Sequence, residues 1–347
     1  MGHRPGERTD SSNTDRINTD SDDKAALVAR AADLADSYIT AERSRRVSPR
    51  SGALDRLGAA VDAITLDEPM RPVDALELVA EIGDIGAVRS TGGRYFGFVN
   101  GGVAPAALAA SIVAAPWDQN VGLPVMSPAA SLLDEAAARL VFDVLGLPTG
   151  TVASFCAGAT IANITAVVTA RDSLLRRAGW DPTTDGLRGA PPIRVVASAE
   201  IHVSVLKALR IAGFGRNDVQ LIPTDGAGRL IATELPAHRG GPTLVALQAG
   251  NVNTGGSDPF GEVIDRLGGE ETWVHVDGAF GLWAAASPAK KGLLAGVERA
   301  DSWATDAHKW LNAPYDCGVV LCRHPRELAT AMAMQAAYVP ADGADRA

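Results

Sequence analysis

Cysteine, basic charge and uninterrupted apolar runs are all scarce in this chain of 347 residues. Its three cysteines, Cys156, Cys317 and Cys322, are an odd number and too few for a disulfide framework. This favours a reducing compartment, the cytoplasm. The formal net charge is −9. We therefore expect no basic surface of the kind that binds nucleic acid or an anionic membrane.

Membrane spans and secretory leaders are also disfavoured. Residues 144–170 carry no charged side chain, but Pro148, Gly150, Gly158 and Asn163 interrupt them, whereas a spanning helix needs about 20 predominantly apolar residues. The first 24 residues are polar and lack the apolar core of a secretory signal. Their composition is typical of a disordered tail.

Short apolar runs alternate with helical patterns in the rest of the chain. The runs predict strands at residues 151–155, 194–198, 219–222, 243–248, 272–277, 301–304 and 318–321. Periodicity and capping residues predict helices at 25–42, 72–83, 128–145, 159–177, 203–211 and 261–267. This alternation predicts an α/β fold with a mostly parallel sheet covered by helices on both faces. Ligands of such sheets bind beyond the carboxyl ends of the strands.

Two of these strand ends carry the residues with the clearest chemistry. Asp277 ends the strand 272–277, and Lys309, 32 residues after Asp277, follows the strand 301–304. Alone, each is most often a turn residue or a surface charge. Together they have the arrangement that pyridoxal phosphate requires, namely a lysine for the Schiff base and an acid for the protonated pyridine nitrogen. His275 and Asp277 stand at alternate positions, but no third metal ligand accompanies them, so we predict no metal site.

Three motifs give the chain a family resemblance: HVDGAF at residues 275–280, ADSWATDAHKWLN at 300–312 and YDC at 315–317. With them, the chain resembles the group II pyridoxal-phosphate-dependent amino-acid decarboxylases from about Tyr95 to Tyr338. The resemblance implies fold type I of the pyridoxal enzymes, whose large domain has a seven-stranded, mostly parallel sheet. It also implies a homodimer with the site at the subunit interface.

The resemblance assigns roles around the cofactor ring. Lys309 would hold the cofactor covalently, Asp277 would pair with the ring nitrogen, and Ala279 would pack against the ring face. His202 resembles the histidine that stacks on the ring. Asn251 lies in a loop similar to the one near the cofactor's 3′-oxygen.

The phosphate group of the cofactor needs hydrogen-bond donors. Gly158, Ala159 and Thr160 match the family's phosphate-binding turn, where a helix N-terminus offers free N–H groups to an anion. His308 resembles a second phosphate contact. Asp306 stands where the animal members carry asparagine. Because an acid beside a phosphate is unfavourable unless it is paired or points away, we assign it no role.

The end of the sequence bears on activity. Tyr338 resembles a tyrosine on a mobile loop that donates the proton to Cα; relatives with phenylalanine there carry out oxidative deamination. In the family a small C-terminal domain follows this loop, whereas the sequence stops at Ala347. We expect a tail at residues 1–24, a helical segment at 25–90, a cofactor-binding domain at 91–335 and the start of the catalytic loop at 336–347, with the C-terminal domain missing.

The sequence therefore predicts a pyridoxal-phosphate-dependent carboxy-lyase that converts an L-amino acid to the amine and CO2. An aldehyde synthase, another pyridoxal-phosphate lyase or transaminase on the same fold, and an inactive truncated remnant remain alternatives. A dinucleotide-dependent oxidoreductase is disfavoured, because no strand is followed by Gly-x-Gly-x-x-Gly and a downstream acid. We expect a cytoplasmic homodimer with a small amino-acid substrate and no nucleic-acid or membrane partner.

Overall fold

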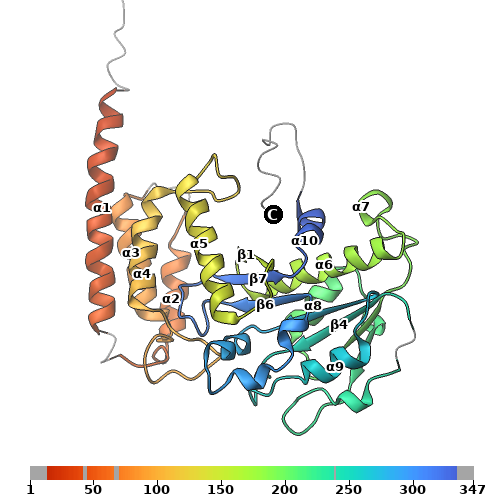
Figure 1. Cartoon of the computed structure of the whole chain (residues 1–347). Helices are drawn as coiled ribbons and strands as arrows, with labels where there is room; N and C mark the ends of the chain where they lie inside the picture. Colours follow the sequence, from red (N-terminus) through yellow and green to blue (C-terminus); the bar gives the residue numbers. More distant parts are fainter. Residues whose placement is uncertain (1–13, 42–44, 66–69, 238–239, 334–347) are drawn as a thin grey trace, which may run out of the picture. The chain divides into compact units, whose positions relative to one another are not determined.

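The computed structural model describes residues 14–41, 45–65, 70–237 and 240–333 (Figure 1). They form two compact units, with the boundary between Gly97 and Phe98. The division falls a few residues after the predicted domain boundary at residue 91. Tyr338 and the rest of the predicted catalytic loop lie outside the described residues.

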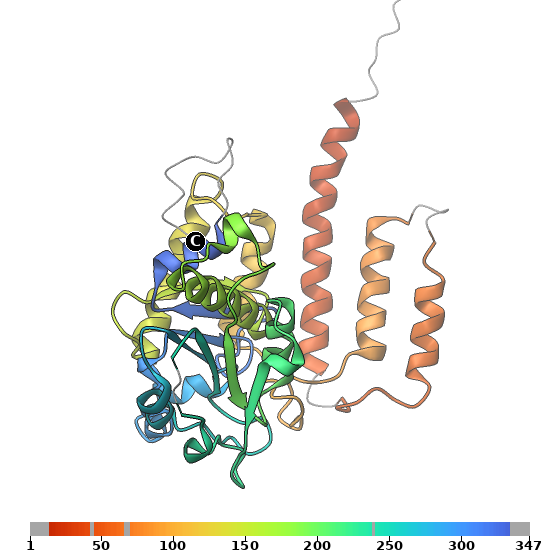
Figure 2. The same ribbon diagram turned by 90° about the vertical axis from the view of Figure 1, so that its right-hand side faces the viewer.

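The first unit contains three helices, α1 (Thr14–Thr40), α2 (Ala53–Asp62) and α3 (Pro72–Gly86), with α3 lying between the other two (Figure 2). Helix α1 begins at Thr14, inside the polar segment 1–24 for which the sequence predicts a tail. Once a helix is nucleated, each added residue gains a backbone hydrogen bond, so α1 extends into a polar segment. Helix α2 was not predicted, because Gly58 lies in the middle of its short pattern.

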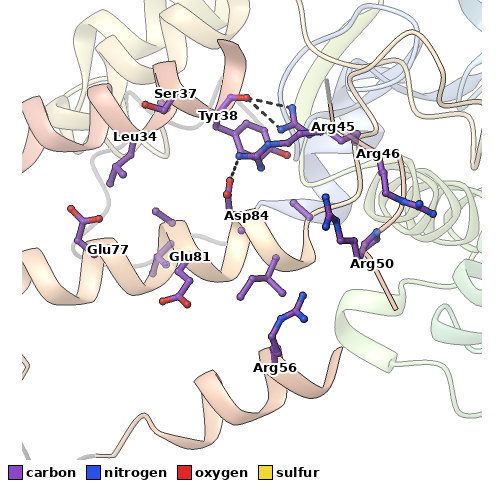
Figure 3. Close-up of a pocket in the computed structure, with 18 of the residues that line it drawn as sticks. Leu34, Ser37, Tyr38, Arg45, Arg46, Arg50, Arg56, Glu77, Glu81 and Asp84 are labelled. Atoms are coloured by element: carbon purple, nitrogen blue, oxygen red, sulfur yellow. Dashed lines mark hydrogen bonds and ion pairs between the residues drawn. The ribbon is translucent and has the colours of Figure 1, made fainter. Parts of the chain in front are cut away.

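A cavity of about 1120 Å³ lies in the first unit, lined by α1, α2, α3 and the segment 45–50. The guanidinium of Arg89 lies 4.1 Å from the centre of the Tyr38 ring, and Arg45 forms an ion pair with Asp84 (Figure 3). None of the residues predicted for the cofactor site lines this cavity. The described residues that are predicted to form the cofactor site all lie in the second unit.

The second unit is built on a seven-stranded sheet of order β1-β7-β6-β5-β4-β2-β3. Strand β7 is antiparallel to both its neighbours, and the other neighbouring pairs are parallel. This confirms the predicted mostly parallel α/β sheet. The strands are β1 (Val152–Cys156), β2 (Arg194–Ser198), β3 (Val219–Ile222), β4 (Thr243–Gln248), β5 (Thr272–Asp277), β6 (Ser302–Asp306) and β7 (Gly318–Cys322).

Helices connect and cover these strands. They are α4 (Pro105–Ala114), α5 (Pro128–Leu145), α6 (Ala159–Arg177), α7 (Pro182–Asp185), α8 (Val203–Ile211), α9 (Phe260–Leu267) and α10 (Pro325–Met332). Short 3-10 helices are η2 (Ala115–Trp117), η3 (Arg216–Asp218), η4 (Ala232–Glu234), η5 (Gly281–Ala286), η6 (Lys291–Leu294) and η7 (Val297–Arg299). Helix α4 was not predicted, because its alanine-rich sequence is almost uniformly apolar and gives no amphipathic period. Across the ranges described above, no helix is both long and apolar enough to span a membrane.

The sheet separates two hydrophobic cores. Along β4, Val245 and Leu247 face the core shared with α5 and α9, whereas Leu244 and Ala246 face the core shared with α6, α8 and α10 (Figure 1). Because both faces are covered, the central strands read as continuous apolar runs. This is why the sequence located them well.

The strand directions gather several polar residues at one edge of the sheet. The carboxyl ends of β4, β5 and β6 lie there, so Gln248 pairs in register with Asp277, and Asp306 pairs with Gly318 at the start of β7. Cys156, at the end of β1, is the other neighbour of Gly318. The fold thus brings together strand ends that lie far apart in the sequence.

Candidate active site at the carboxyl edge of the sheet

Asp277 is a buried carboxylate at the end of β5, with 2% of its surface exposed. Its Oδ1 accepts a hydrogen bond from the Ala279 N–H at 3.1 Å, and its Oδ2 accepts from the Ser204 hydroxyl at 3.4 Å. Burial raises the pKa of the Asp277 carboxyl, while the Ala279 N–H and the charges of His202 and Lys309 act in the opposite direction. Within the described ranges, no cationic side chain lies at ion-pair distance from Asp277. A bound cation would complete this site.

Lys309 lies at the same edge and is held by Asp306. The Lys309 Nζ lies 2.9 Å from the Asp306 Oδ2. The other oxygen, Oδ1, accepts a hydrogen bond of 2.5 Å from the N–H of Ala159, the first residue of α6. Asp306 is buried, so this bridge is poorly screened by water. It joins the predicted Schiff-base lysine to the predicted phosphate turn.

The turn before α6 is tightly packed. Gly158 has φ 145°, a conformation that side chains disfavour. A Cβ atom on Gly318 would overlap the backbone of Gly158. His308 lies alongside, with its Nε2 3.5 Å from the Asp306 carboxylate and its Nδ1 accepting a 3.0 Å hydrogen bond from the Cys317 N–H. The structure therefore brings the phosphate-turn residues and His308 together, with Thr160 in the first turn of α6.

His202 stands at the N-terminus of α8. Its Nδ1 accepts from the Ser204 N–H at 3.2 Å and lies 2.7 Å from the Ser204 hydroxyl oxygen. Its backbone N–H donates to the Gln248 side chain at 3.1 Å. Because Ser204 also contacts Asp277, the exposed imidazole of His202 belongs to the same cluster.

Asn251 is buried and engaged within its own loop. Its amide nitrogen donates to Glu200 at 2.9 Å. Its amide oxygen accepts from the N–H groups of Asn253 at 2.9 Å and Thr254 at 3.3 Å. These contacts shape the loop after β4, and a contact with the cofactor's 3′-oxygen stays a prediction.

A segment that the sequence did not assign to the site packs on the loop after Lys309. The Tyr315 hydroxyl donates to the Asn100 side chain at 2.7 Å, and the Ala104 N–H donates to the Asn312 carbonyl at 2.7 Å. A Cβ atom on Gly101 would overlap the Lys309 carbonyl. The adjacent glycines 101 and 102 were the signal in the sequence for this close backbone approach.

Comparison with solved structures defines the class of protein. Mouse CSAD in apo form superposes with a TM-score of 0.81 at 26% identity, covering 92% of this chain and 69% of that chain. Oryza sativa TDC with PLP and tryptamine gives a TM-score of 0.78 at 24% identity, covering 96% and 69%. The fold is thus the α/β fold of the type I pyridoxal-phosphate enzymes, as predicted.

The family follows from the sequence comparisons. The pyridoxal-dependent decarboxylase conserved domain matches residues 86–345, which is more than half of the chain. The chain belongs to this family.

Two relatives show how much of a full-length member is present. Aromatic-L-amino-acid decarboxylase from Bacillus atrophaeus is 32% identical over 203 residues, covering 56% of this chain and 40% of that protein. Cysteine sulfinic acid decarboxylase from Rattus norvegicus is 30% identical over 242 residues, covering 68% and 48%. The chain thus spans about half the length of these curated relatives.

Proposed function

We propose that this chain holds pyridoxal phosphate covalently through Lys309 and removes CO2 from an L-amino acid to give the amine. The observation that carries the proposal is the buried Asp277 carboxylate, which has no cationic partner at ion-pair distance among the described residues. The Lys309 amine lies in the same cluster and acts on the pKa of this carboxyl. The names of the curated relatives, all decarboxylases, support it.

The residues present fit this cofactor. A protonated pyridine nitrogen is the cation that a buried carboxylate such as Asp277 lacks. The N-terminus of α6 provides the positive end of the helix dipole for a phosphate, and its first N–H, that of Ala159, donates to Asp306. Gly158 has no side chain in the way, and His308 lies beside the turn. Ala279, which follows Asp277 closely, leaves room for a flat ring.

When bound, the cofactor supplies an electron sink for the electron pair that remains on Cα after CO2 leaves. Asp277 would keep the ring nitrogen protonated, because a nearby carboxylate stabilises the charged form. Lys309 would hold the cofactor between turnovers, and His202 would cover one face of the ring. Tyr338, outside the described residues, is the proposed donor of the proton to Cα.

We propose that the active form is a cytoplasmic homodimer, in line with the three free cysteines. Helices α4 and α5 and the turn η2 expose large apolar side chains that a second copy would cover: Ile112, Val113, Trp117, Leu132, Leu133 and Leu140. Light scattering of the purified chain, with Leu140→Asp as a disruptive variant, tests this part of the proposal. A monomeric wild-type chain contradicts it.

Product analysis tests the reaction. The chain is incubated with pyridoxal phosphate and single L-amino acids, and the amine, CO2, aldehyde and ammonia are quantified. Amine and CO2 in equal amounts are expected, with none formed by Lys309→Ala. Aldehyde with ammonia would establish the oxidative alternative, and no product from any amino acid contradicts the proposed activity. In Tyr338→Phe we expect the product to shift toward aldehyde.

A further inference from the structure

A chain of hydrogen bonds runs through the protein interior behind Asp277. It starts at Trp273, whose indole N–H donates to the Ser302 hydroxyl at 2.9 Å. The Ser302 oxygen lies 3.0 Å from the Nδ1 of His275. The Nε2 of His275 lies 2.9 Å from the side-chain oxygen of Asn163 on α6. All four residues are completely buried.

The chain ends on the carboxylate. The Asn163 amide nitrogen donates to the Ser204 hydroxyl at 3.4 Å, and this hydroxyl lies 3.4 Å from the Asp277 Oδ2. The Asn163 amide also acts to lower the pKa of the Asp277 carboxyl, against the larger effect of burial. A line of polar groups therefore crosses from β5 and β6 to α6 and α8 and back to the end of β5.

The chemistry of the two ends fixes the direction of the line. The Trp273 indole only donates, and an ionised carboxylate only accepts. Between them, the Asn163 amide nitrogen donates to Ser204, so the amide oxygen faces the Nε2 of His275 and accepts its ring proton. The Nδ1 of the neutral ring is then an acceptor for the Ser302 hydroxyl. The NH2 group of Asn163 faces the Ser204 hydroxyl beside Asp277. The opposite arrangement would set the Asn163 oxygen against the carboxylate.

His275 can take this place because it is neutral. Burial lowers the pKa of its imidazole to about 4, so at neutral pH the ring has one donor and one acceptor. A charged ring would also donate from Nδ1, so Ser302 would accept from both neighbours and the line would no longer run in one direction. His275 thus differs from His202, which lies exposed at the mouth of the site.

We propose that His275 is a positioning residue: a neutral, Nε2-protonated imidazole that orients the Asn163 amide so that its N–H groups point at Asp277. These donors favour the ionised form of a carboxylate that burial would otherwise protonate. The consequence for the ligand rests on the proposed function, because it is there that Asp277 meets the ring nitrogen. The line itself consists only of side chains of this chain.

The first test needs no cofactor. Nitrogen-15 chemical shifts of the histidine side chains at pH 7 distinguish the two neutral tautomers, and the His275 signals are assigned by their loss in His275→Gln. The Nε2-protonated tautomer is expected. The Nδ1-protonated tautomer or a charged ring would overturn the proposal.

The second test compares affinities for pyridoxal phosphate by absorption titration. His275→Phe fills the space without hydrogen bonds, whereas His275→Gln keeps a donor and an acceptor. We expect Kd to rise about tenfold or more in His275→Phe, the cost of unpaired buried groups, and to be largely rescued in His275→Gln. Wild-type affinity in a folded His275→Phe protein contradicts the positioning role.

If His275→Phe does not fold, a matched pair of tryptophan variants tests the line at its other end, at Trp273. Trp273 and Trp303 are both buried, but the Trp303 indole donates to the Val297 carbonyl at 2.9 Å, outside the line. Trp273→Phe should weaken pyridoxal phosphate binding, and Trp303→Phe should not. Equal effects overturn the proposal. If the wild-type chain binds no pyridoxal phosphate, the proposed function fails, while the tautomer measurement still decides on His275.

Discussion

The Asp306 carboxylate bridges the Lys309 amine, at 2.9 Å, and the first N–H of helix α6, at 2.5 Å. It therefore places a negative charge at a helix N-terminus and beside a lysine, where both interactions are favourable. In the animal enzymes that the chain resembles, asparagine stands here. In this chain the Asp306 carboxylate accepts from the first N–H of the turn that is predicted to bind phosphate.

The first prediction concerns that charge. A bound phosphate at the α6 N-terminus would lie close to the Asp306 carboxylate, and the two like charges repel. Asp306→Asn keeps the size and an acceptor for the Ala159 N–H but removes the charge. We expect Kd for inorganic phosphate to fall about tenfold, measured by calorimetry at constant ionic strength. Asp265→Asn, which removes an exposed carboxylate elsewhere, should leave it unchanged. Unchanged or weaker phosphate binding in Asp306→Asn would refute the competition.

The second prediction concerns the covalent attachment. Lys309→Ala removes the only amine placed in the site by the described residues, so the visible absorption band formed with pyridoxal phosphate should be lost. Lys207→Ala removes an exposed lysine of α8 and should retain the band. The measurement is an absorption spectrum of each protein after removal of free cofactor. A normal band in Lys309→Ala excludes this lysine as the attachment site.

The third prediction concerns stability against pH. In the folded chain, the pKa of His275 is lowered from 6.5 to about 4, and that of Asp258 is raised from 3.8 to about 6, both mainly by burial. Between pH 4 and 6.5, His275 is protonated in the unfolded chain but neutral in the folded chain. Its contribution to the unfolding free energy therefore increases as pH rises through this range. Between pH 3.8 and 6, Asp258 is protonated in the folded chain but ionised in the unfolded chain. Its contribution to the unfolding free energy therefore decreases as pH rises through this range. Each contributes about 3 kcal/mol, and the two oppose each other.

Single substitutions separate the two contributions. Between pH 4 and 6.5, the unfolding free energy of His275→Gln should rise by up to about 3 kcal/mol less than that of the wild type. That of Asp258→Asn should rise by about 3 kcal/mol more than that of the wild type. Urea denaturation at several pH values measures both. If all three proteins show the same pH dependence, the burial-shifted pKa values are wrong.

The fourth prediction concerns packing at the phosphate turn. Gly318→Ala introduces a methyl group into the backbone of Gly158, so we expect a loss of about 1–3 kcal/mol in unfolding free energy and weaker pyridoxal phosphate binding. Gly292→Ala is the matched control, because nothing lies within 4 Å of its added Cβ. Denaturation and cofactor titration check both variants. Equal stability of the two would show that the turn can relax.

The buried strands and the helices next to the site were predictable from local pattern. Strands β2 to β5 and helices α5, α6 and α8 have the bounds that the sequence indicated. Helix α5 shows why: Ser127 caps its start through the Ala130 N–H, and Gly146, with φ 62°, ends it. Helix α2 was not predictable because Gly58 interrupts its short pattern, and α4 because its alanine-rich sequence has almost no amphipathic period.

The sequence by itself determined which residues stand at the strand ends: Asp277 as the last residue of β5 and Lys309 beyond β6, each within a recognisable motif. Only the tertiary structure decided what these residues touch. Asp306 meets Ala159 across 147 positions of sequence, and His275 meets Asn163 across 112. Local pattern fixes the period and ends of an element, but strand order and helix packing decide which polar groups share the dry interior. There each buried donor must find an acceptor, and this requirement placed Asp306 on Lys309 and His275 behind Asp277.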